Sequence, residues 1–210
     1  MSLILSRLYA IVDADVLKAR GASLQEFARE LRDAGVCLVQ YRDKSGSPQQ
    51  ILGAAQEISQ IFDGIEDARL VMNDRADLAL LAGWGVHVGH EDLSPEDVRN
   101  VLGGGPVIGV STHNERQVTE ADSGSADYVA IGPVFATATK ENTEPVVGLE
   151  GVRRARALTR KPLVAIGGIT RENARSVMDA GADSVAVIGA LLGTRERPGK
   201  IAKDFLDILR

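Results

Sequence analysis

Eight short apolar runs rich in Val and Ile alternate with longer amphipathic stretches along the whole of this 210-residue chain. Most of the runs are apolar at consecutive positions, which is typical of parallel strands that helices cover on both faces. The stretches between them have the spacing of helices, as in Ser23–Ala34 and Pro48–Phe62. The predicted strands are Leu8–Asp13, Val36–Asp43, Arg69–Asp74, Gly85–His90, Val107–His113, Tyr128–Phe135, Pro162–Gly168 and Ser184–Leu191.

This alternation predicts a parallel sheet with right-handed crossovers. Eight strand–helix repeats suit an α/β fold of the (β/α)8 type, a TIM barrel, and 210 residues fall at the short end of its range. A doubly wound sheet can also hold eight strands, but no Gly-x-Gly-x-x-Gly follows the first predicted strand. We therefore expect a single TIM-barrel domain over residues 1–210, with its active site at the C-terminal mouth of the strands.

Composition excludes several other classes of protein. The 24 basic and 29 acidic side chains give a formal charge of −5, which argues against a general nucleic-acid or anionic-membrane binder. The single cysteine, Cys37, excludes an internal disulfide and favours a cytoplasmic location. We expect no membrane span, which needs about 20 apolar residues, and no signal peptide in the short apolar start. The sequence leaves the oligomeric state undecided, a homo-oligomer included.

Polar side chains at the end of the second predicted strand form the first candidate site. Gln40, Arg42 and Lys44 stand at alternate positions, so an extended segment points all three to one side. Gln40 lies in an otherwise apolar run, and a buried amide without partners costs about 1–3 kcal/mol. We interpret the three as an amide and two cations that converge at the mouth. The alternative is that Arg42 and Lys44 are solvated charges leaving the strand.

A candidate metal site follows the next two strands. Asn73 and Asp74 end the third strand and Asp92 follows the fourth, so the two carboxylates lie on neighbouring strands. Two carboxylates beside cations suit a magnesium ion that keeps several waters and bridges phosphate oxygens. The alternative is that each Asp caps the helix that follows it.

Glycines close the last two strands, at Gly167-Gly168 and at Gly189. Such glycines let backbone N–H groups approach a phosphate, although they can also serve only to make tight turns. The long polar loop Ala136–Val147 follows the sixth strand at the same mouth. His87 is expected to be structural, whereas His90 and His113 lie near strand ends and are candidates for acid–base chemistry. No His-Glu-x-x-His spacing indicates a catalytic zinc.

Six segments, in consistent order from about Leu8 to Leu191, resemble the thiamine-phosphate synthase family. They are Val39-Gln-Tyr-Arg-Asp-Lys44, Asn73-Asp74, Val88-Gly-His-Glu-Asp92, Gly109-Val-Ser-Thr-His113, Gly132-Pro-Val-Phe-Ala-Thr-Ala-Thr-Lys140 and Ile166-Gly-Gly-Ile169. The resemblance implies a transferase that condenses 4-amino-2-methyl-5-(hydroxymethyl)pyrimidine diphosphate with 4-methyl-5-(2-phosphoethyl)thiazole. The products are thiamine monophosphate and pyrophosphate, and the implied mechanism is dissociative.

The resemblance also implies the roles of particular residues. Asp74 and Asp92 would hold one Mg²⁺, and Arg42, Ser111 and Lys140 would act in catalysis. The pyrimidine diphosphate would be held by Gln40, Tyr41, Arg42, Asp43, Lys44, Asn73, Ser111 and Lys140. The thiazole phosphate would be held by Thr137, Ala138, Thr139, Gly168, Ile188 and Gly189.

This chain departs from the family pattern at two of these positions. His90 stands where the family commonly has glutamine, and Gly189 stands where it commonly has serine. Loss of a serine hydroxyl removes one hydrogen bond, worth about 0.5–1.5 kcal/mol, from the thiazole phosphate. A thiazole tautomerase of the same superfamily and a non-catalytic phosphate-binding barrel remain as alternatives. The cations and the carboxylate pair argue against the tautomerase, which has no pyrophosphate to bind.

Overall fold

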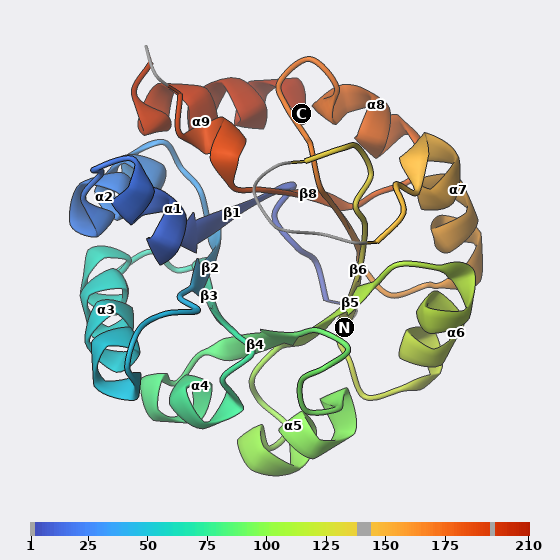
Figure 1. Cartoon of the computed structure of the whole chain (residues 1–210), viewed down its shortest axis with the longest axis horizontal. Coiled ribbons are helices and arrows are strands. Elements are labelled where there is room, and N and C mark those ends of the chain that lie inside the picture. Colours follow the sequence, from blue (N-terminus) through green and yellow to red (C-terminus); the bar gives the residue numbers. More distant parts are fainter. Residues whose placement is uncertain (1–2, 138–143, 194–195) are drawn as a thin grey trace.

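Eight parallel strands pair in chain order and the first pairs with the eighth, so the sheet closes into a barrel (Figure 1). The structure is a computed structural model, and it describes residues 3–137, 144–193 and 196–210. The strands are β1 Leu8–Asp13, β2 Leu38–Arg42, β3 Arg69–Asn73, β4 Gly85–Val88, β5 Ile108–Thr112, β6 Tyr128–Ile131, β7 Leu163–Ile166 and β8 Ser184–Val187. The predicted TIM barrel is confirmed.

Helices surround the barrel, and polar side chains cap several of their N-termini (Figure 1). Ser23 caps α2, and Ser47 forms a capping box with Gln50 at the start of α3. These two helices confirm the predicted helical stretches. The helices are α1 Ala14–Ala19, α2 Leu24–Asp33, α3 Pro48–Ile61, α4 Ala76–Ala82, α5 Pro95–Leu102, α6 Glu115–Ser123, α7 Gly148–Leu158, α8 Ala174–Asp179 and α9 Pro198–Ile208, with a 3₁₀ turn, η1, at Gly189–Leu191.

Several strands end earlier than the apolar pattern predicts. The predicted strand Tyr128–Phe135 stops at Ile131, and the predicted Ser184–Leu191 stops at Val187. Hydrophobic residues beyond these points are still buried, because they pack into the layer between the sheet and the helices; Val134 and Leu191 have no exposed surface. Hydrophobicity alone therefore does not distinguish the end of a strand from a buried loop that follows it.

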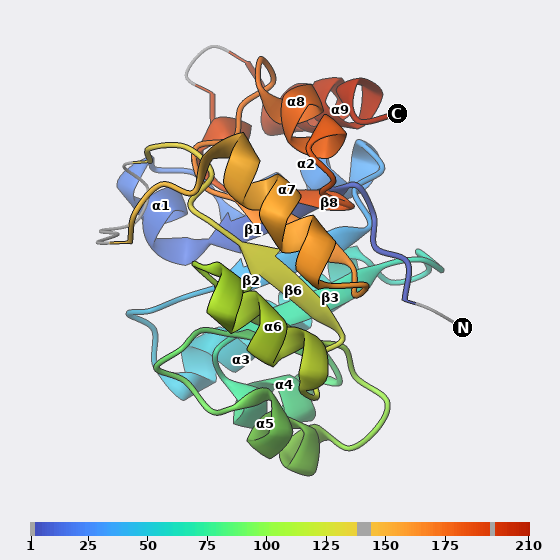
Figure 2. The ribbon, with the colours of Figure 1, turned by 90° about the vertical axis from the view of Figure 1, so that its right-hand side faces the viewer.

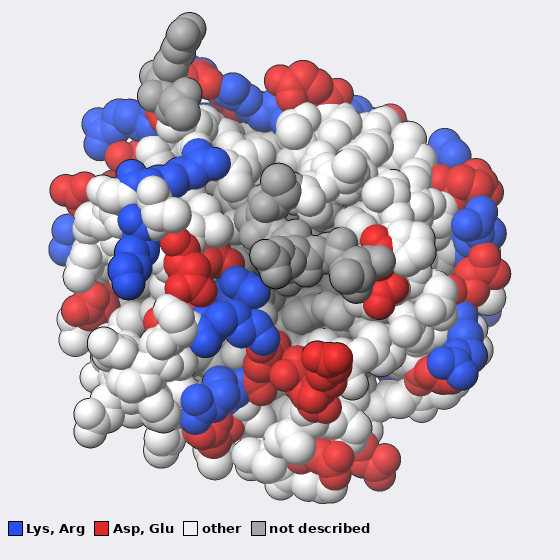
Figure 3. Space-filling model, viewed as in Figure 1, with Lys and Arg blue, Asp and Glu red and all other residues white. Residues whose placement is uncertain are grey.

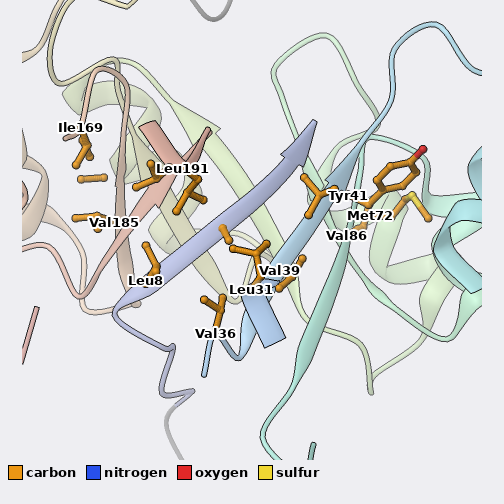
Figure 4. Packing of buried hydrophobic residues seen from close by; sticks show 14 of the residues in the cluster. Leu8, Leu31, Val36, Val39, Tyr41, Met72, Val86, Ile169, Val185 and Leu191 are labelled. Carbon is orange, nitrogen blue, oxygen red and sulfur yellow. The ribbon is translucent and has the colours of Figure 1, made fainter. Parts of the chain in front are cut away.

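The alternation of side chains divides the core into two layers. On β1, Tyr9 and Ile11 point into the barrel, whereas Leu8, Ala10 and Val12 join the layer between the sheet and the helices. Figure 4 shows part of this outer layer, in which Tyr41 of β2 lies beside Met72 of β3. The barrel interior also holds buried polar side chains, such as Gln40 and His87. These side chains are candidates for contact with a ligand at the mouth of the barrel.

The two ends of the barrel differ in what they carry. Figure 2 shows the chain entering β1 on the side where α9 ends, and the loops that follow the strands lie on the opposite side. Parallel strands place all of their carboxyl ends at that second side. Among the described residues, no helix combines the length and the apolar character needed to cross a membrane.

Candidate active site

A cavity of about 800 Å³ opens at the carboxyl ends of the strands. Figure 3 shows basic and acidic side chains gathered beside the central hollow, over the ends of β2, β3 and β4. The sequence-predicted residues that line the cavity are Gln40, Arg42, Lys44, Asn73, Asp74, Asp92, Ser111, Thr137, Gly168, Ile188 and Gly189. Residues from six strand ends and the long loop therefore meet in one place.

Strand β2 supplies Gln40 and Arg42, and Lys44 follows two residues after the strand ends; all three side chains lie on the side that the alternation predicts. Gln40, Arg42 and Lys44 line the cavity, whereas Tyr41 and Asp43 point to the other side of the strand. The Tyr41 hydroxyl donates to Asp43 Oδ2 at 3.1 Å, and Asp43 Oδ1 accepts from the Gly46 amide at 2.7 Å. Burial raises the pKa of Tyr41, and the Asp43 carboxylate adds to the shift. In this structure Tyr41 and Asp43 shape the loop after β2 from outside the cavity.

Arg42 is held by Asp13, at the end of the neighbouring strand β1. Arg42 Nη1 donates to Asp13 Oδ2 at 2.6 Å, and the Asp13 side chain is only 1% exposed. Arg42 Nε is buried and has no hydrogen-bond partner among the residues that the structure describes. A buried N–H without a partner costs free energy unless a ligand accepts from it. The guanidinium is therefore held in place by Asp13 and carries an N–H group that none of the described residues engages.

Asp74 lies between a cation and a second carboxylate. Lys44 Nζ forms an ion pair with Asp74 Oδ2, and the Asp74 amide donates to the His87 carbonyl at 2.8 Å. Burial raises the pKa of Asp74; Lys44 lowers it, and the adjoining Asp92 raises it again. Asp74 has a φ of 61°, a left-handed conformation that Asp tolerates better than most residues. The backbone thus turns this carboxylate toward Asp92.

Neither carboxylate caps the helix that follows it, which was the alternative. Helix α4 begins after Arg75 with no side-chain cap, and Ser94 caps α5 by accepting from the Asp97 amide. Asp92 instead accepts from the Gly89 amide at 2.7 Å, which ties the loop after β4 back on itself. Both carboxylates line the cavity.

The donor set of Asp74 and Asp92 fits a magnesium ion. Burial and the adjoining Asp92 raise the pKa of Asp74, and a divalent cation beside the two carboxylates would stabilise the charged form of Asp74. The described residues contain no group of three or more His, Cys, Asp or Glu side chains that could enclose a metal. Mg²⁺ commonly binds through one or two carboxylates together with waters and phosphate oxygens, so two suffice.

The glycines after β7 have conformations that other residues do not adopt easily. Gly167 has a φ of 103° and Gly168 a φ of 62°. A Cβ on Gly167 would lie 2.6 Å from Pro133 Cα, and one on Gly168 would lie 2.6 Å from the Ala136 carbonyl oxygen. Close approach of the β6 and β7 loops therefore requires both glycines, and it leaves backbone exposed along this side of the cavity.

The remaining residues predicted for the thiazole phosphate divide into two groups. Ile188 and Gly189 line the cavity where β8 passes into η1, and Thr137 lines it from the long loop. Ala138, Thr139 and Lys140, also predicted to bind substrates, lie outside the described residues.

The cavity is also lined by residues that the sequence assigned to neither a substrate nor the metal: Arg20, which it did not indicate, and three histidines, of which His90 and His113 were acid–base candidates. Arg20, after α1, reaches across to donate to the Leu192 carbonyl and lines the cavity. His87 lines it as well and contacts Ser111, with 2.9 Å between Nε2 and Oγ. His90 and His113, with ring centres 6.1 Å apart, both line the cavity, and His113 Nδ1 donates to the Gly132 carbonyl at 2.6 Å. No sequence signal distinguishes Arg20 from other helix-end arginines.

A TIM barrel whose C-terminal mouth joins two cations, two carboxylates and glycine-edged strands has the site arrangement of a barrel enzyme. A family model described as thiamine monophosphate synthase matches residues 8–191. The thiamine-phosphate synthase of Koribacter versatilis is 55% identical over 208 residues, which is 98% of this chain and 96% of that protein. This chain belongs to the thiamine monophosphate synthase family.

Further relatives agree with this assignment. The thiamine-phosphate synthase of Caldicellulosiruptor bescii is 39% identical over 188 residues, which is 89% of this chain and 85% of that protein. The solved structure of a thiamine phosphate pyrophosphorylase from Pyrococcus furiosus is similar with a TM-score of 0.86 at 32% identity. That match covers 97% of this chain and 95% of the other. The similarity therefore extends over nearly the whole chain.

Proposed function

We propose that this chain condenses 4-amino-2-methyl-5-(hydroxymethyl)pyrimidine diphosphate with 4-methyl-5-(2-phosphoethyl)thiazole. The C–O bond to the diphosphate breaks, and pyrophosphate leaves with the electron pair. A C–N bond then forms between the pyrimidinylmethyl carbon and the thiazole nitrogen, which gives thiamine monophosphate. The order of bond breaking before bond making is the dissociative mechanism that the family resemblance implies.

A dissociative reaction requires the protein to neutralise charge on a leaving group. Arg42 and Lys44 line the side of the cavity where the diphosphate is proposed to bind, and Arg42 carries N–H groups besides the one that Asp13 accepts from. Asp74 and Asp92 would hold Mg²⁺, which supplies a divalent charge to the diphosphate oxygens when it is bound. Asn73 and Ser111 add polar groups from β3 and β5. Lys140 is proposed to meet the same leaving group.

The second task is to hold the nucleophile in line with the carbon that it attacks. The backbone at Gly168 and Gly189 and the Thr137 side chain are proposed to hold the thiazole phosphate, with Ile188 beside them. Anchoring that phosphate on the β7 and β8 side places the thiazole opposite the cations of β2. No strong base is needed, because the thiazole nitrogen attacks with its own lone pair.

One observation carries the proposal most directly. A single cavity joins the cation and carboxylate groups of β2 to β4 with the glycine edges of β7 and β8. A barrel that bound only one phosphate would need only the glycine edges of β7 and β8. A tautomerase has no pyrophosphate to neutralise, so it would not need the cation and carboxylate groups.

The test is to incubate the purified chain with both substrates and magnesium and to measure thiamine monophosphate and pyrophosphate. We expect the two products in equal amounts, and neither when one substrate is omitted. A chain that isomerises a thiazole tautomer but releases no pyrophosphate would be a tautomerase. A chain that binds phosphates without turnover would be a non-catalytic barrel. Gel filtration of the same sample shows whether it is a homo-oligomer.

A further inference from the structure

Arg20 is one of three Lys and Arg side chains that line the cavity among the described residues, and it differs from the other two. Arg42 forms an ion pair with Asp13, and Lys44 forms one with Asp74. Within the part of the chain that the structure describes, Arg20 forms no ion pair, and it is exposed. A guanidinium is always charged in proteins, so Arg20 brings to the cavity a positive charge that none of these residues neutralises.

The end of helix α1 fixes the point from which the Arg20 side chain extends. The Arg20 amide donates to the Leu17 carbonyl at 3.1 Å, and the Gly21 amide donates to the Lys18 carbonyl at 3.1 Å. Gly21 has a φ of 62°, the left-handed conformation in which a glycine ends a helix at little cost. Leu17 is buried in the layer between the sheet and the helices. The backbone at Arg20 is therefore held against the barrel.

The Arg20 guanidinium lies beside the turn that follows β8. Strand β1 pairs with β8, and α1 follows β1 directly. Arg20 Nη1 donates to the Leu192 carbonyl, and the Leu192 amide donates to the Gly189 carbonyl at 3.1 Å. One turn of 3₁₀ helix rises by about 6 Å, so the guanidinium is held about one turn from Gly189. This contact uses one of the five N–H groups of the guanidinium.

This side of the cavity has no charged residue of its own. The described residues that line the cavity from β7 to η1 are all uncharged, and Gly189 has no side chain. The thiazole phosphate, which is proposed to bind here, carries a charge of about −1.5 to −2 near neutral pH. Removing such a charge from water is costly unless a group of opposite charge accompanies it. Arg20 is the described cation that is tied to this side.

We propose that Arg20 is a further binding residue of the second substrate, and that its guanidinium pairs with the thiazole phosphate at the β8 side of the mouth. The inference rests on the proposed function. A guanidinium forms charge-assisted hydrogen bonds with phosphate oxygens, and the backbone at Gly168 and Gly189 would supply the remaining contacts. The competing explanation is that Arg20 serves only to tie α1 to the segment after β8.

The first test asks whether the effect of Arg20 depends on the phosphate. Arg20→Gln removes the charge but keeps a hydrogen-bonding side chain. Parent and variant are each assayed with the thiazole phosphate and with 4-methyl-5-(2-hydroxyethyl)thiazole, which lacks the phosphate. We expect kcat/KM for the phosphate to fall about tenfold or more, chiefly through KM, and kcat/KM for the alcohol to stay within about twofold. Loss of a merely structural tie would lower both alike.

The second test measures binding without turnover. Isothermal titration calorimetry compares thiamine monophosphate, which carries the thiazole phosphate, with thiamine, which does not. We expect Arg20→Gln to raise the Kd of thiamine monophosphate about tenfold and to leave that of thiamine unchanged. Arg20→Lys keeps the charge but not the planar fork of donors, so it should raise the Kd of thiamine monophosphate by only about threefold.

Arg7→Gln is the matched control. Arg7 also donates from Nη1 to a backbone carbonyl, that of Leu209 at 2.6 Å, but it precedes β1 and so lies at the opposite end of the barrel. The variant loses the same charge and a contact of the same kind, away from the cavity. It should keep the parent's preference for the phosphorylated thiazole and the parent's Kd for thiamine monophosphate.

The outcomes separate this inference from the proposed function. Equal losses with the phosphate and with the alcohol, or an unchanged Kd for thiamine monophosphate in Arg20→Gln, would overturn the role of Arg20 and leave the proposed function standing. A parent that neither forms nor binds thiamine monophosphate would overturn the proposed function and this inference with it. If the parent does not condense the alcohol, the Kd values decide. Should Arg20→Gln fail to fold, an unchanged Kd for thiamine monophosphate in Arg20→Lys would overturn the proposal.

Discussion

The Asp13 carboxylate connects the guanidinium of Arg42 to the start of a helix. Its Oδ2 accepts from Arg42 Nη1 at 2.6 Å, while its Oδ1 accepts from the Val16 amide at 3.0 Å and so caps α1. Asp13 ends β1 directly beside Arg42 in the ladder with β2. One buried acid therefore sets the position of a cation that the proposed reaction needs.

We predict that Asp13→Asn lowers kcat/KM for condensation about 10- to 100-fold, chiefly through a higher KM for the pyrimidine diphosphate. Asn keeps the cap, because it serves as well as Asp at that position, but it leaves Arg42 without its counter-charge. Steady-state kinetics with each substrate varied in turn measures the effect. Asp77→Asn, which removes an exposed ion pair with Arg75, is the control and should match the parent. Equal kinetics for the two variants would show that Asp13 does not position Arg42.

Lys140→Ala is predicted to slow turnover more than it weakens binding. Loss of one charge-assisted hydrogen bond to the leaving pyrophosphate, worth about 1.5–3 kcal/mol, corresponds to about 10- to 150-fold in rate. The rate at saturating substrates and magnesium is the measurement. An unchanged rate would remove Lys140 from the reaction.

His90→Gln, which introduces the common family residue, should leave condensation within about threefold of the parent. The dissociative mechanism needs no base at this position, and neutral glutamine retains a hydrogen-bonding side chain. Initial rates under identical conditions test this. Abolished condensation would give His90 a catalytic role and favour the tautomerase alternative.

Gly168→Ala is predicted to raise the KM for the thiazole phosphate about tenfold or more, with a smaller effect on the pyrimidine diphosphate. The new Cβ would meet the Ala136 carbonyl oxygen at 2.6 Å, at a φ of 62° that alanine adopts poorly. The backbone must therefore move where the phosphate is proposed to bind. Gly104→Ala, where nothing lies within 4 Å of the new Cβ, is the control. If both variants keep the parent KM for the thiazole, the phosphate binds elsewhere.

Much of this fold follows from the sequence, because buried parallel strands need apolar residues on both faces. The predicted strand Leu8–Asp13 agrees with β1, and the helices predicted after positions 23 and 47 begin at their serine caps. The ends of the later strands were predicted too far along the chain. Ile188 and Leu191 resemble strand residues because they are apolar and buried. In the structure Ile188 directly precedes a 3₁₀ turn and Leu191 ends it.

The site was less predictable, because it depends on contacts between strands far apart in the chain. The alternation of Gln40, Arg42 and Lys44 follows from the two-residue period of a strand and needs no tertiary information. Tyr9 and Tyr128, in contrast, look like ordinary core residues of β1 and β6. Their meeting inside the barrel depends on how the sheet closes, which the sequence of neither strand reveals.

The central claim is that Asp74 and Asp92 hold magnesium on the diphosphate, on the other side of the cavity from the second phosphate. The most direct measurement is the initial rate as a function of magnesium concentration for the parent and for Asp92→Asn. The side-chain oxygen of the Asn that replaces Asp92 can accept from the Gly89 backbone N–H as the carboxylate does, so the loop should keep its shape. The Asn side chain, however, brings no negative charge to Mg²⁺. We predict that the variant needs about tenfold more magnesium or more, condenses more slowly, and binds the thiazole phosphate as the parent does. Superimposable magnesium curves for the two proteins would contradict the account.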